Sequence, residues 1–244
     1  MNQRPTFGEI AWPLDSESLE QAREWAHEMT EQVLDWTWQA FEQLHEKQLS
    51  RVDFQQPLEQ IERDLTSKHF ICILEIWRRE TDGYCAVIPV HEYPELATRP
   101  VGAGKPPAYD LAFVWQENQR VVWPLEAKVV KSPTALREYL HDIDKYCTGR
   151  AAPFVEHGGL IAYLLDGSPN DFFTKLGSKI GVPLTKSSAY GRRPYRMSYH
   201  ERQLAPRICL HHLVLSTTRR ASRTKNRRRS SIKTSTNEHM GVAK

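Results

Sequence analysis

The stretch PAYDLAFVWQENQRVVWPLEAKVV, residues 107–130, consists of two apolar segments on either side of a polar turn. Apolar, β-branched and aromatic residues bounded in this way predict two antiparallel strands joined as a hairpin. Charged residues are costly inside apolar strands. The first segment nevertheless contains Asp110, and the second contains Glu126 and Lys128. The hairpin predicts a sheet, and the cost of its charged residues indicates that they have a function.

The expected register of the hairpin places its charges together. With the turn centred on Asn118, Asp110 faces Glu126 across the two strands. Facing residues have Cβ atoms about 4.5–5.5 Å apart, and two carboxylates that close repel each other unless a cation or a proton lies between them. Lys128 follows Glu126 by two positions and therefore points to the same face. A shift of the turn by one residue would break this pairing.

Metal-dependent hydrolysis of phosphodiesters uses this set of groups. Carboxylate oxygens from Asp110 and Glu126 suit Mg²⁺, with Mn²⁺ as a substitute, and the backbone carbonyl of Ala127 is a further ligand. The metal stabilises charge on the phosphate and makes a bound water more nucleophilic. The Lys128 ammonium can orient that water or bind the phosphate. These residues are the predicted catalytic and metal-binding groups.

The pattern resembles the PD-(D/E)xK superfamily, the restriction-endonuclease-like nucleases. Asp110 matches the Asp of the motif, Glu126 its acidic position and Lys128 its lysine, whereas Tyr109 replaces the proline that gives the motif its first letter. The resemblance covers roughly residues 57–215. It implies a mixed sheet flanked by helices, a Mg²⁺-dependent nuclease activity and a place in bacterial defence or mobile-element systems. DNA is favoured over RNA as the substrate, and the sequence leaves the choice between them open. The alternative is that the charges only keep an edge strand soluble.

The remaining pattern fits an α/β fold with a mixed central sheet. Apolar steps of three and four predict helices over 16–47 and 57–80. A strand is expected over 84–90, a helix over 134–148 ending at Gly149, and a buried strand over 159–166. A helix over 169–180, a Pro- and Arg-rich connection and a last strand over 207–216 follow. Helices on both faces of the sheet are the natural packing for this order.

A third carboxylate from a helix before the hairpin is often added in the resembled superfamily. Glu62, Glu75 and Glu92 are the candidates. Glu75 is the predicted metal ligand among them, because it lies in the apolar run ICILEIW, where a charge without a function is most costly. Each of the three also has the simpler interpretation of a surface residue.

Several basic residues are predicted to contact nucleic acid. Lys145 shares one face of the 134–148 helix with Tyr139 and Asp142, in a helix that packs beside the site in the resembled fold. Arginines interleaved with tyrosines suit phosphate and base contacts, and Ser198, His200 and Arg202 alternate along one side of an extended segment. His211 and His212 are adjacent in a strand and point to opposite faces, so they cannot share a metal. The predicted contacts in the Arg-rich stretch are Arg192, Arg193, Arg196, His200 and Arg202.

Composition and charge divide the chain into three parts. Residues 216–244 carry nine Lys or Arg and one Glu, so this end is strongly basic although the whole chain is only +3. The expected organisation is an N-terminal helical extension over 1–56, a nuclease-like core over 57–216 and a disordered basic tail over 217–244. A basic end suits an anionic partner such as nucleic acid, and the acidic first helix could dock a protein partner. Homo-oligomerisation is left open.

Other features narrow the class of protein. No apolar run approaches the length of about 20 residues needed to cross a bilayer, and the N-terminus lacks the layout of a signal peptide. We therefore expect no membrane partner and a cytoplasmic location. The four cysteines are scattered singly, which predicts free thiols and argues against zinc. The alternative function is a non-catalytic nucleic-acid-binding or complex-forming subunit on the same fold.

Overall fold

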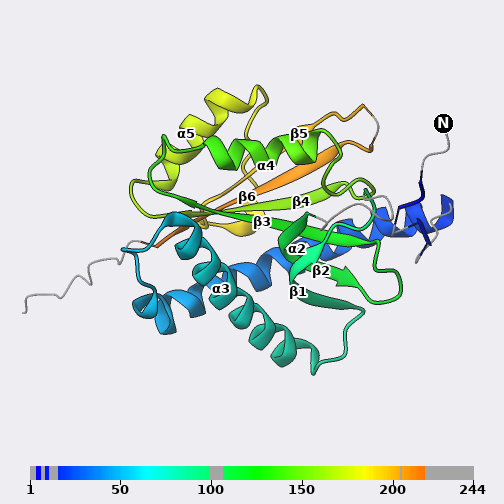
Figure 1. Cartoon of the computed structure of the whole chain (residues 1–244), viewed down its shortest axis with the longest axis horizontal. Helices are drawn as coiled ribbons and strands as arrows, with labels where there is room; N and C mark the ends of the chain where they lie inside the picture. Colours follow the sequence, from blue (N-terminus) through cyan, green and yellow to red (C-terminus); the bar gives the residue numbers. More distant parts are fainter. Residues whose placement is uncertain (1–3, 7–8, 11–15, 99–106, 204, 218–244) are drawn as a thin grey trace, which may run out of the picture.

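The centre of the computed structural model is a six-stranded mixed sheet in the order β1-β2-β3-β4-β6-β5 (Figure 1). The structure describes residues 4–6, 9–10, 16–98, 107–203 and 205–217. Strands β1, β2 and β3 pair antiparallel, β4 lies parallel between β3 and β6, and β5 runs antiparallel to β6 at the edge. The strands are β1 Val87–Pro94, β2 Ala108–Trp115, β3 Val122–Val130, β4 His157–Leu164, β5 Tyr195–His200 and β6 Ile208–Ser216.

Helices cover both faces of this sheet. In Figure 1, α4 and α5 lie in the upper half of the view and α2 and α3 in the lower half, with the sheet between them. Side-chain contacts define the two faces. Trp123 donates to Thr30 of α2 on one face, and Tyr139 of α4 contacts His212 on the other. The helices are α2 Ser16–Lys47, α3 Leu58–Thr81, α4 Arg137–Cys147 and α5 Pro169–Ile180, with short 3₁₀ helices η1 Leu49–Arg51 and η2 Ser188–Tyr190.

The helix ends follow the signals in the sequence. Asp82 and Gly83 adopt left-handed backbone conformations, with φ values of 50° and 75°, and end α3 close to residue 80, where the helix was expected to end. Ser168 accepts a hydrogen bond from the Asp171 amide and begins α5. Gly181, with φ 69°, ends α5, because glycine adopts this conformation without a Cβ clash. Local chemistry therefore fixes the lengths of these helices.

The largest differences from the expected elements concern the two edge strands of the sheet. The strand expected over 84–90 begins later, at Val87, and continues to Pro94. The Arg-rich connection contains an additional strand, β5, which pairs along its whole length with β6. An edge strand is paired on one side only, so arginines and a preceding proline are compatible with it. This is why its composition resembled that of a loop.

The long helix α2 shares its core with the sheet. Val33, Leu34 and Trp36 have no exposed surface, and the Trp36 ring stacks on Phe113 of β2 at a centroid distance of 5.9 Å. The expected boundary at residue 56 therefore separates parts that pack against each other. The expected basic tail lies outside the described residues beyond Thr217.

Among the described residues, no helix is both long enough and apolar enough to span a membrane. Charged residues recur along the two longest helices, α2 and α3, which explains this result.

Candidate functional site

Strands β2 and β3 separate where the predicted charges lie. Their register is the expected one, with Phe113 opposite Trp123 and Leu111 opposite Leu125 as the last pair. The backbone ladder then stops, and Asp110 is turned so that its Oδ2 accepts the Ala127 amide at 2.8 Å. A carboxylate thus replaces the carbonyl that a continuing β2 would have offered to this amide.

Glu62 of α3 takes the next amide along the same edge. Its Oε2 accepts the Val129 N–H at 2.9 Å, and its Oε1 accepts from the Lys128 ammonium, also at 2.9 Å. Backbone amides beyond the last strand pair need acceptors when they are buried. Side-chain carboxylates fill that need here, and they are therefore held in place by the backbone of β3.

Lys128 lies at the centre of the site. Besides Glu62, its Nζ is 3.5 Å from Asp110 Oδ2, 3.5 Å from Asp142 Oδ2 and 2.9 Å from the Ala127 carbonyl oxygen. Burial alone would lower the pKa of Lys128, but the carboxylates of Asp110, Asp142 and Glu62 outweigh burial and raise it. The ammonium is therefore charged at every pH at which the protein is handled.

Glu126 is the most deeply buried of the predicted catalytic carboxyls, with 5% of its surface exposed. Burial raises its pKa well above the usual value, and the charges of Asp110 and Asp142 raise it further against the opposing effect of Lys145 and Lys128. A bound cation would oppose this rise, because it favours the charged carboxylate form.

Asp142 and Lys145 of α4 complete the group. The Asp142 carboxylate is 1% exposed, and its Oδ1 lies 2.6 Å from the Lys145 ammonium. Neither of its oxygens makes a hydrogen bond of good geometry within the described residues, although both lie at ion-pair distance from a lysine. Buried carboxylate oxygens in this condition are rare. We call the whole group the carboxylate–lysine cluster; it consists of Glu62, Asp110, Glu126, Lys128, Asp142 and Lys145.

An opening of about 340 Å³ leads to the edge of this cluster. Glu92 of β1 stands opposite Asp110, because its neighbours His91 and Tyr93 pair with Leu111 and Tyr109. Its backbone has a φ of 53°, a conformation that costs a residue other than glycine about 1–3 kcal/mol. Such strain tends to lie at functional sites. The opening is lined by Glu59, Glu62, Arg63, Thr66, His91, Glu92 and Asp110.

Glu75, the predicted third carboxylate, is not part of the cluster. It is exposed and accepts a hydrogen bond from Gln43 of α2. It lies thirteen residues beyond Glu62 on α3, which corresponds to about 20 Å along a helix. The helical carboxylate that lies beside Asp110 and Lys128 is Glu62, and not Glu75 as predicted. The apolar run around Glu75 misled the prediction, because Glu75 and Ile71 share the exposed side of α3.

The predicted nucleic-acid contacts separate into two groups. Arg202 donates to the backbone carbonyls of Ala152 and Val155, both at 2.9 Å, and to that of Pro206. Its guanidinium therefore holds loops together. Arg193 forms ion pairs with α2 at Asp35 and Glu42. Arg192 is exposed, and Arg196 lies over the Phe173 ring at 4.7 Å.

His200 has an internal role as well. Its Nε2 lies 2.8 Å from the Ser198 hydroxyl, which also contacts His212 Nε2 at 2.7 Å. His212 Nδ1 in turn lies 2.9 Å from the Tyr139 hydroxyl. We call these four residues the β5 network. They are buried and bonded to one another. His200 was predicted to contact nucleic acid, and the structure shows it instead as a member of this internal network. His211 points to the opposite face, as expected.

Sequence reasoning underestimated Glu62 and Asp142 and did not identify Lys145 as the partner of Asp142. Asp142 and Lys145 are three residues apart on a helix, which does indicate one shared face. Glu62 carried no local signal, because the turn of α3 that meets the hairpin is decided by tertiary packing. Comparisons of the chain with protein-family models, curated proteins and solved structures found no match.

Proposed function

We propose that this protein is a Mg²⁺-dependent nuclease with a restriction-endonuclease-like fold. The observation that carries the proposal is the carboxylate–lysine cluster, in which four carboxyl groups surround two ammonium groups at the point where β2 and β3 separate. Because four carboxyl groups face only two ammonium groups, the cluster favours the uptake of a further cation.

The donor set fits a hard divalent cation. Asp110, Glu126 and the Ala127 carbonyl offer oxygen ligands, which Mg²⁺ and Mn²⁺ prefer. When bound, the ion would supply charge stabilisation at the phosphate and a more acidic water. Asp110 is already oriented by the Ala127 amide.

Lys128 is the group that acts on the substrate. The neighbouring carboxylates raise its pKa and favour the ammonium form, which can hold the attacking water and neutralise the phosphate. Glu62 fixes the Lys128 ammonium and the β3 backbone at once, and is a positioning residue. Asp142 holds Lys145 at the side of the cluster, where a second ammonium can bind the polyanion.

DNA is the favoured substrate, and a component of a bacterial defence or mobile-element system is the favoured setting. Both come from the resemblance of Asp110, Glu126 and Lys128 to the PD-(D/E)xK motif. Arg192 and Arg196 are the arginines of the 191–202 stretch left as candidates for sequence-independent phosphate contacts.

The test is a cleavage assay with the full chain on duplex DNA, single-stranded DNA and RNA, with Mg²⁺, with Mn²⁺ and with a chelator. We expect metal-dependent cutting that Asp110→Ala removes. Glu62→Gln should weaken cutting strongly, whereas Glu75→Gln, the same change on the same helix, should leave it unchanged.

Two results would count against the proposal. The first is wild-type protein that binds these substrates but cuts none of them with either metal, which favours the non-catalytic alternative. The second is cutting that survives Asp110→Ala, which would indicate a contaminating nuclease or a different site.

A further inference from the structure

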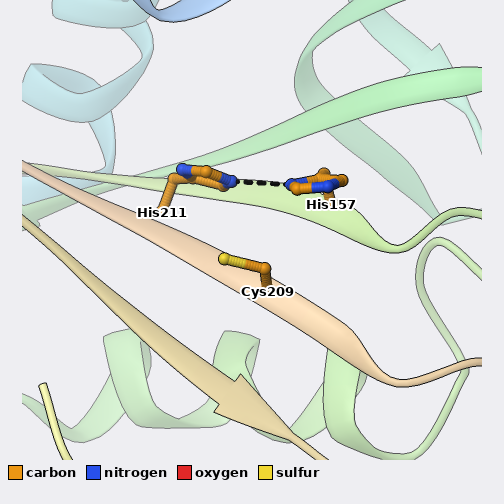
Figure 2. A group of neighbouring side chains, drawn as sticks. All are labelled: His157, Cys209 and His211. Atoms are coloured by element: carbon orange, nitrogen blue, oxygen red, sulfur yellow. Dashed lines mark hydrogen bonds between the residues drawn. The ribbon is translucent and has the colours of Figure 1, made fainter. Parts of the chain in front are cut away.

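A second group of ligand-type side chains lies on the opposite face of the sheet. His157 of β4 pairs with Cys209 of β6, and His211 follows Cys209 by two positions, so all three point to one side (Figure 2). This is the side covered by α2, because the His211 ring lies 5.5 Å from that of Trp123, which bonds to α2. We call these three residues the His–Cys cluster. In the carboxylate–lysine cluster, by contrast, Lys128 contacts Asp142 of α4.

The geometry of the His–Cys cluster is close to that of a tetrahedral metal site. One ligand atom from each residue can be chosen so that all lie within 4.8 Å of one another. His157 Nδ1 and His211 Nε2 are 3.0 Å apart, as the dashed line in Figure 2 marks. Zn–N bonds of about 2.0–2.1 Å and Zn–S bonds of about 2.3 Å separate tetrahedral ligands by about 3.3–3.7 Å. Small side-chain movements would suffice.

The orientation of His211 is already fixed by a further residue. Its Nδ1 bonds to the Tyr195 hydroxyl, which leaves Nε2 directed at His157 and Cys209. Zinc-bound histidines commonly have such a partner on the second ring nitrogen.

We propose that His157, Cys209 and His211 bind a Zn²⁺ ion, with His27 of α2 at the fourth position. The His27 and His157 rings have centroids 5.8 Å apart, and the exposed His27 side chain would have to turn toward the other three ligand atoms, which already lie within 4.8 Å of one another. One sulfur and several imidazole nitrogens favour zinc over the magnesium of the nuclease proposal. The ion would fasten α2 to strands β4 and β6, so its role is to stabilise the fold.

Sequence reasoning argued against zinc because the cysteines do not form pairs with zinc-like spacing. The ligands instead come from three elements that only the fold brings together. The one local signal is Cys209-Leu210-His211, in which residues two apart on a strand share a face. The partner His157 is 52 positions before Cys209, and only the parallel β4–β6 pairing places them side by side.

The experiment uses the untagged full chain, stripped of metal under reducing conditions and titrated with Zn²⁺ and, as a spectroscopic probe, with Co²⁺. We expect one equivalent to bind, with a cobalt–thiolate absorption band, and thermal stability to rise. Cys209→Ser should remove the band and weaken zinc binding at least about tenfold. Cys147→Ser, a matched change of a half-buried cysteine on α4, should leave both unchanged.

The inference is independent of the proposed nuclease activity. Asp110→Ala should bind zinc like the wild type, and excess Mg²⁺ should not displace the zinc. Wild-type protein without a cobalt–thiolate band, or equal zinc affinity for Cys209→Ser and Cys147→Ser, would overturn the site. Unchanged affinity of His27→Gln would overturn the assignment of the fourth ligand.

Discussion

Two strands of the sheet carry polar side chains at every second position: β3 with Glu126 and Lys128, and β5 with Ser198 and His200. On β5 the polar atoms are bonded to one another through His212 and Tyr139. On β3 the carboxyl groups outnumber the ammonium groups, and Asp142 lacks hydrogen bonds of good geometry. The β5 network is complete in itself, whereas the cluster around β3 has capacity for a further partner.

The difference has a physical cause. Neutral hydroxyl and imidazole groups can alternate as donor and acceptor, so a chain of them can satisfy all its members. Ionised carboxylates only accept, and a group with more of them than of cations remains under repulsion. An alternating polar pattern in a strand therefore indicates a structural network or a binding site according to the charges it contains.

The largest expected effect is on catalysis. Under the proposed nuclease function, Lys128→Met should lower the rate of metal-dependent DNA cleavage about 10²–10³-fold, because it removes the charge that we propose faces the phosphate and the attacking water. The measurement is single-turnover cleavage at saturating protein, with circular dichroism to check folding. Lys131→Met is the matched control, since Lys131 is exposed three positions later on the chain. Similar losses in both variants would contradict the special position of Lys128.

A second test concerns acid stability through His69 of α3. This histidine is fully buried between the Tyr163 hydroxyl and the Thr37 carbonyl, and burial lowers its pKa from 6.5 to about 4. Between these values the unfolded chain binds a proton that the folded protein does not, so stability is lost as the pH falls through this window. The loss should be about 3 kcal/mol.

Urea denaturation at pH 7 and pH 4 measures this contribution. The pH dependence of the unfolding free energy should become shallower in His69→Gln than in the wild type. His141→Gln, a change at an exposed histidine of α4, should keep the wild-type dependence. The comparison between variants is needed because other buried groups also titrate. Parallel pH profiles for all three proteins would refute the assignment.

A third test asks whether Arg202, which follows β5, stabilises the fold or contacts DNA. Arg202→Ala removes a guanidinium that donates to three backbone carbonyls, and should lower the unfolding free energy by on the order of 2 kcal/mol. DNA affinity per folded molecule should not change. Arg192→Ala should show the reverse, with stability within about 0.5 kcal/mol of the wild type. Weaker DNA binding by folded Arg202→Ala would restore its predicted role as a phosphate contact.

Much of the fold followed from local patterns, and the site followed less completely. The hairpin register was predictable because the turn and the apolar alternation both constrain it, and this placed Asp110, Glu126 and Lys128 on one face. The choice of Glu62 over Glu75 depended on which turn of α3 meets the hairpin, and that is set by packing against α2 and the sheet. The strand β5 was missed because its backbone pairing with β6 outweighs its own composition.

The smallest expected effect is at Glu92. Two substitutions at this residue can separate the cost of its backbone strain from the contribution of its carboxylate. Glu92→Gly relieves a left-handed backbone at a cost in unfolded-chain entropy, and should raise the unfolding free energy by about 1 kcal/mol. Glu92→Ala removes the same carboxylate but keeps the Cβ and therefore the strain. If the carboxylate beside Asp110 contributes to metal or substrate binding, both variants should lose cleavage activity while only Glu92→Gly gains stability. Stabilisation by both changes would mean that charge repulsion, and not backbone strain, is the cost of Glu92 at this position.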